Sequence, residues 1–78
     1  MKLSTILENY SHEELIKADG FDDAVVGIEV NTFRLVYSID RMIAILTKDM
    51  SYEDAIEYLD FNVFSAYVGE KTPIYIYT

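Results

Sequence analysis

The stretch AVVGIEVNTFRLVY, residues 24–37, decides the fold of this 78-residue chain. Apolar residues alternate along it on both sides of Asn31 and Thr32, a pattern that predicts two half-buried strands joined in a hairpin. A two-residue turn at Asn31-Thr32 would place three apolar pairs opposite each other: Val30 with Phe33, Ile28 with Leu35, and Val26 with Tyr37. A slip of one residue would separate all three pairs, so the pattern also predicts the register. Because Thr32 suits a two-residue turn poorly, a longer loop remains open.

Two helices are predicted to follow this hairpin. Ser38 is a suitable N-cap for the first, whose apolar residues recur at helical spacing: Ile39, Met42, Ile43 and Leu46. Ser51 is a suitable N-cap for the second, which we expect to reach Tyr67 and to end at Gly69. Its predicted core stripe consists of Tyr52, Ala55, Ile56, Leu59, Val63, Ala66 and Tyr67.

The two ends of the chain supply the remaining elements. Ser11 and Glu14 match a capping box, which predicts a helix that ends at Gly20, and an earlier apolar stripe runs through Leu3, Ile6, Leu7 and Tyr10. Residues 74–77 predict a final strand after Pro73. The order α-β-β-α-α-β predicts one α+β domain over residues 1–78. We expect a three-stranded, mostly antiparallel sheet with helices packed on one face.

Composition narrows the classes of function. The chain is 51% hydrophobic with seven Tyr and four Phe, it has no Cys, and its net charge is −8. We therefore expect no direct binding to nucleic acid or to an anionic membrane, both of which need clustered cations. No apolar stretch approaches the length of a membrane span, and the absence of Cys permits a reducing compartment, so we expect a cytoplasmic protein.

The negative charge is concentrated between Asp49 and Glu70, which hold six acids and no base. On the predicted third helix, Glu53, Glu57 and Asp60 share a side with two phenylalanines, Phe61 and Phe64. One interpretation is a face that docks a basic partner or a second copy of the chain. The alternative is that the second helix covers the phenylalanines and only the acids are solvated.

The last strand raises a related question, because Tyr75 and Tyr77 share one of its faces and Ile74 and Ile76 the other. If the isoleucines point inward, the two tyrosines are exposed. They are then candidates for self-association, or they form a wetted face of the sheet.

No pattern in the sequence predicts catalysis, a cofactor or a metal site, and we expect the protein not to be an enzyme. The acids around Gly20, namely Asp19, Asp22 and Asp23, lack the spacing of a calcium-binding loop. His12 is the only histidine, and no nucleophile stands near it in the sequence.

The segments MSYEDAIEY (residues 50–58), FN (61–62) and AYVGEKTPI (66–74) resemble a family of small, mostly uncharacterised proteins of tailed bacteriophages and prophages. Residues 19–28 and 35–37 carry the same likeness, which covers roughly residues 12–76. The resemblance implies an accessory protein that acts by binding in the cytoplasm of a bacterial host. It brings no catalytic residues.

Two hypotheses about function follow. The first is an acidic inhibitor of a host defence protein or a nucleic-acid-handling protein, acting on a basic surface of that partner. The second is a homo-oligomer that holds a small ligand such as a nucleotide through tyrosines and backbone amides. Its available cations would be Lys71, Arg34 and Arg41.

Overall fold

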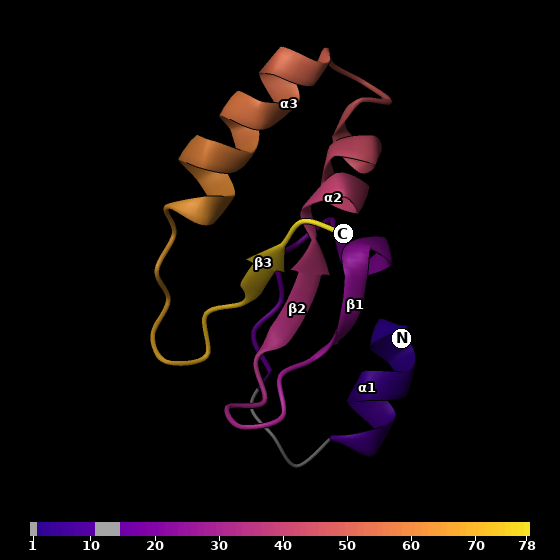
Figure 1. Cartoon of the computed structure of the whole chain (residues 1–78), viewed down its shortest axis with the longest axis vertical. Coiled ribbons are helices and arrows are strands. Elements are labelled where there is room, and N and C mark those ends of the chain that lie inside the picture. The colour runs from indigo at the N-terminus through magenta and orange to yellow at the C-terminus, as the bar shows by residue number, and fades with distance from the viewer. Residues whose placement is uncertain (1, 11–14) are drawn as a thin grey trace.

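The computed structural model describes residues 2–10 and 15–78 and shows an α+β fold built around a three-stranded sheet (Figure 1). This confirms the predicted fold class. The elements in chain order are α1 (Leu3–Asn9), a 3-10 turn η1 (Asp22–Ala24), β1 (Val25–Ile28), β2 (Leu35–Ser38), α2 (Ile39–Leu46), α3 (Tyr52–Leu59), a π-helical segment η2 (Asp60–Phe64) and β3 (Ile74–Ile76).

The sheet has the strand order β1-β2-β3. β1 and β2 form the predicted antiparallel hairpin, whereas β3 pairs with β2 in parallel. The chain reaches β3 by leaving β2 directly into α2, passing through α3 and η2, and returning along a long loop (Figure 1). This crossover carries the chain back to the start of β2, as a parallel pairing requires.

The hairpin keeps the predicted register only at the middle one of the three predicted pairs. Ile28 pairs with Leu35, as predicted, but a bulge at Val26 makes Val25 the partner of Tyr37. A bulge inserts one extra residue into one strand and so changes which side chain faces the core. Val25 is therefore buried in place of Val26.

The hairpin turn is the longer of the two loops considered above, not the two-residue turn at Asn31-Thr32. Glu29 N donates to Arg34 O over 2.9 Å, and Phe33 N donates to Glu29 O over 2.8 Å, so residues 30–33 form the loop. The predicted pair of Val30 and Phe33 does not form: Val30 is 77% exposed, and Phe33 adopts a positive φ of 57°. Hydrogen bonds from the Thr32 hydroxyl and from the loop amides hold the pKa of the Glu29 carboxyl below its ordinary value.

The N-terminal helix is shorter than predicted. α1 buries Leu3 and Ile6, but residues 15–18 are not helical, so the predicted continuation to Gly20 is wrong over those residues. The amide of Ala18 donates to the Tyr37 hydroxyl over 2.8 Å, which replaces a helical hydrogen bond. The predicted capping box at residues 11–14 lies outside the described residues.

Both predicted serine caps are confirmed. Ser38 Oγ accepts from Arg41 N at the start of α2, and Ser51 Oγ accepts from Asp54 N at the start of α3. The third helix is nevertheless shorter than predicted, since its α-helical part ends at Leu59 and continues only as η2.

The core lies between the sheet, α1 and the inner sides of α2 and α3. Its fully buried side chains include Tyr37, Ile6, Leu35, Met42 and Leu59. In the described part of the chain, no helix has both the length and the apolar character needed to cross a membrane.

Candidate docking face

The three acids predicted on the third helix lie together on its exposed side. Glu53, Glu57 and Asp60 are all exposed, while Ala55 and Leu59 on the opposite side are buried. At about 100° per residue, the spacing of these five residues separates an acidic side from an apolar side. Among the described residues, none forms an ion pair with Glu53, Glu57 or Asp60. Their charges are therefore left to solvent or to a partner.

The two phenylalanines predicted on this side have different environments in η2. Phe61 is 78% exposed and follows directly after Asp60. The Phe64 ring packs 5.0 Å from the ring centre of Tyr75 and belongs to the margin of the core. The predicted shared side assumed α-helical geometry, whereas η2 is π-helical, with i to i+5 hydrogen bonds and a wider turn. We call Glu53, Glu57, Asp60 and Phe61 the acidic face.

Three tyrosines of α3 and the chain after it are exposed, which the sequence pattern did not predict. Tyr52 is 62% exposed and Tyr67 is 77% exposed, although the predicted stripe placed both in the core. Tyr58, which the stripe omitted, is 41% exposed. The change of helix type after Leu59 accounts for Tyr67, because the stripe assumed an uninterrupted helix. Tyr52 is exposed although it precedes that change, as the first residue of α3.

The predicted self-association pair is also divided. Parallel pairing places Tyr75 opposite Tyr37, with ring centres 5.8 Å apart, so Tyr75 faces the core side. Tyr77 lies beyond the end of β3 and is 80% exposed. Ile76, expected to point inward if the tyrosines were exposed, is 37% exposed. Self-association through these residues stays a prediction, with Tyr77 as its exposed member.

The three cations of the small-ligand hypothesis do not share one site. Arg34 Nε donates to the Thr72 carbonyl, and Lys71 Nζ donates to the Thr32 carbonyl, each over 2.5 Å. Both line one surface hollow, while Arg41 lines another, shared with Asp22 and Asp23. Arg34 and Lys71 thus hold the hairpin loop against the segment that precedes β3.

Within the described residues, no group of three or more His, Cys, Asp or Glu side chains is arranged to hold a metal ion. Comparison of the chain with protein-family models, curated proteins and solved structures finds no match.

Proposed function

We propose that this protein acts by binding another protein that presents a basic surface, and that the acidic face makes the contact. The observation that carries the proposal is Phe61, a large apolar side chain that is 78% exposed in the same helical segment as three acids without an ion-pair partner among the described residues. Packing of the protein's own core explains neither the exposed Phe61 ring nor the cluster of three acids. A partner would bury the ring and neutralise the charges.

Aromatic and charged residues have different roles in protein interfaces, and the acidic face contains both kinds. Buried aromatic side chains at the centre supply much of the binding energy. Charges around them steer the encounter and select partners of opposite charge. The net charge of −8 adds a long-range attraction toward a basic surface, and this attraction weakens as salt is added.

The biological setting of the proposal rests on the resemblance to bacteriophage and prophage proteins. In that setting the partner is a host protein in the bacterial cytoplasm, either a defence protein or an enzyme that handles nucleic acid. Such enzymes present basic grooves to phosphate backbones, and an acidic protein can compete for a groove of that kind.

The test is capture of a partner from bacterial host lysate by matched variants. One variant neutralises the acidic face (Glu53→Gln, Glu57→Gln and Asp60→Asn). The control changes the net charge equally at other exposed positions (Glu8→Gln, Asp23→Asn and Asp40→Asn). We expect the first variant to lose a partner that the wild type and the control retain, and we expect molar salt to release it.

A second pair of variants separates the aromatic contribution from charge. Phe61→Ala should reduce capture of the same partner, whereas Val30→Ala, at a position of equal exposure in the hairpin loop, should not. Capture that is equal in all four variants, or that is unchanged in molar salt, would refute the proposal.

A further inference from the structure

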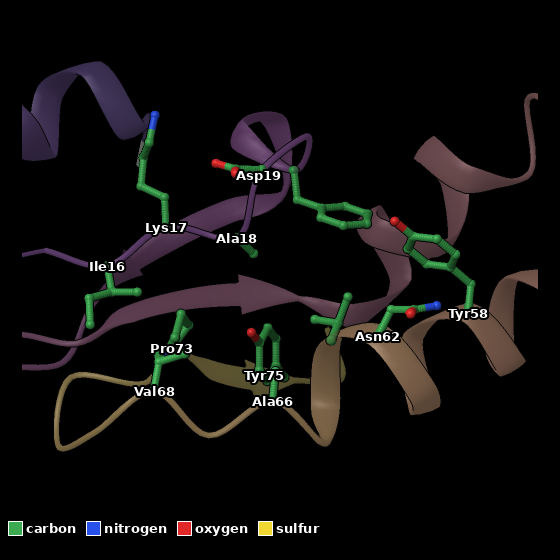
Figure 2. Close-up of a pocket in the computed structure, with 12 residues that line it drawn as sticks. Ile16, Lys17, Ala18, Asp19, Tyr58, Asn62, Ala66, Val68, Pro73 and Tyr75 are labelled. Carbon is green, nitrogen blue, oxygen red and sulfur yellow. The ribbon is translucent and has the colours of Figure 1, made fainter.

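A pocket of about 280 Å³ opens where η2 leaves α3, beside the acidic face (Figure 2). Its floor comes from side chains packed on the core, Phe21, Pro73 and Tyr75, and its rim comes from Tyr58 and Asn62. Three stretches of the chain, residues 16–21, 58–68 and 73–75, thus contribute to one hollow. The π-helical turn belongs to this wall, and single π-helical turns occur frequently at functional sites.

The pocket lining combines aromatic rings with polar side-chain groups that form no hydrogen bond within the described residues. Tyr58, Asn62 and Tyr75 project from α3, η2 and β3 around the pocket in Figure 2. Within the described residues, the two tyrosine hydroxyls and the Asn62 amide form no hydrogen bond. In contrast, the Tyr37 hydroxyl, which lies outside the pocket lining, accepts from Ala18 N. The unpaired groups are therefore available to a ligand.

These features define the chemistry of an occupant. Aromatic walls favour a flat ring that can stack or meet them edge to face. An amide side chain offers one acceptor and two donors, which is how Asn and Gln recognise the adjacent donor and acceptor on the edge of a nucleobase. We propose that this pocket binds a planar, uncharged heteroaromatic ring of nucleobase size, with Asn62 pairing to its edge and Tyr58 and Tyr75 contacting the ring.

The volume of the pocket and the charges that line it favour a nucleobase-sized ring over a larger or phosphorylated ligand. An apolar cavity of about 150 Å³ holds one benzene ring, so this pocket has room for one fused two-ring molecule. Lys17 is the only cation among the described lining residues, and its ammonium group points away from the tyrosines toward α1 (Figure 2). That ammonium group lies 3.9 Å from Asp22. The described lining thus lacks a cation directed at a phosphate.

The experiment is a titration of the ¹⁵N-labelled protein with adenine, followed by amide chemical shifts. We expect saturable shifts confined to residues 16–21, 58–68 and 74–75, with a sub-millimolar dissociation constant. Asn62→Ala should weaken binding by about five- to tenfold, the loss of a typical hydrogen bond. Ala66→Phe, at an exposed lining position, should fill the pocket and abolish binding.

Three controls make the result decisive. Asn9→Ala removes an exposed amide on α1 and should leave the affinity for adenine unchanged. Toluene and inorganic phosphate should each bind far more weakly than adenine. Unchanged spectra at saturating adenine, equal affinity in Asn62→Ala, or equal binding of toluene would overturn the proposal. None of the residues of the acidic face lines the pocket, so this outcome is independent of the test for a protein partner.

Discussion

The sheet half of the molecule and the segment between Asp49 and Glu70 use apolar residues in opposite ways. In the described part of the chain, that segment supplies only two of the eleven buried hydrophobic residues, Ala55 and Leu59. The same segment supplies five of the nine large hydrophobic residues that are exposed: Tyr52, Tyr58, Phe61, Tyr67 and Val68. It also carries six acids and no base.

A high apolar content therefore does not by itself mean a large core. A domain of this size buries only about 60% of the surface of its unfolded chain, so some aromatic residues must remain outside. Here five of the nine exposed large hydrophobic residues lie between Asp49 and Glu70, together with three acids that form no ion pair among the described residues. Packing of the core explains the apolar residues of the sheet, whereas the exposed aromatic residues between Asp49 and Glu70 need another explanation.

The sharpest test of this contrast compares two truncations to alanine. Leu35→Ala, at a fully buried position on the central strand, should cost about 2–5 kcal/mol. Phe61→Ala removes a larger side chain and should change the free energy of unfolding by less than about 0.5 kcal/mol. Urea denaturation followed by circular dichroism measures both. A loss of more than about 1 kcal/mol in Phe61→Ala would mean that Phe61 supports the fold and that the contrast is false.

A finer comparison removes one hydroxyl from each of two paired strands of the sheet, Tyr37 on β2 and Tyr75 on β3. Tyr37→Phe deletes the acceptor of the Ala18 amide and should cost about 1–2 kcal/mol. Tyr75→Phe deletes a hydroxyl that has no hydrogen bond among the described residues, so its effect should be close to zero. The same urea experiment measures both. Equal losses would show that Tyr75 has a structural partner and would weaken its assignment to the pocket.

Alkaline unfolding should depend on the same two tyrosines. Burial raises the pKa of both hydroxyls above the ordinary 10.0. The folded protein then holds these protons more tightly than the unfolded chain, so their stabilisation is complete below pH 10 and is lost as the pH rises through the folded pKa values. Tyr75→Phe should therefore show a shallower loss of stability above about pH 10 than the wild type. Tyr77→Phe, at an exposed position, is the control and should follow the wild type.

Sequence reasoning succeeded where neighbouring residues determine the structure. Ser38 and Ser51 cap their helices because a hydroxyl can accept from an amide three residues ahead, whatever the rest of the fold does. The pairing of Ile28 with Leu35 follows from an alternation that spans only the hairpin. The acids of the third helix were placed correctly for the same reason, since one side of a short helix can be counted from its sequence.

It failed where distant contacts decide. The bulge at Val26 sets Val25 opposite Tyr37, whose hydroxyl also binds Ala18, and no local pattern encodes that bond across nineteen positions. The inward direction of Tyr75 depends on its parallel pairing with Tyr37. The pocket forms where residues 16–21, 58–68 and 73–75 come together, and no local pattern in the sequence indicates that they do.

The smallest expected effect concerns the cost of the acidic face. Glu53 and Glu57 are like charges four residues apart on α3, an arrangement that destabilises a helix by about 0.2–0.5 kcal/mol. Glu57→Gln should therefore raise the free energy of unfolding by that amount at low salt. The gain should vanish near 1 M salt, where the Debye length is about 3 Å. Asp40→Asn, which removes an acid from the favourable first turn of α2, should lower it instead. Urea denaturation at both salt concentrations can resolve the opposite signs. A stabilised Glu57→Gln that also loses its partner would show that the chain keeps an unfavourable charge for binding, whereas a destabilised one would mean that Glu57 supports the fold.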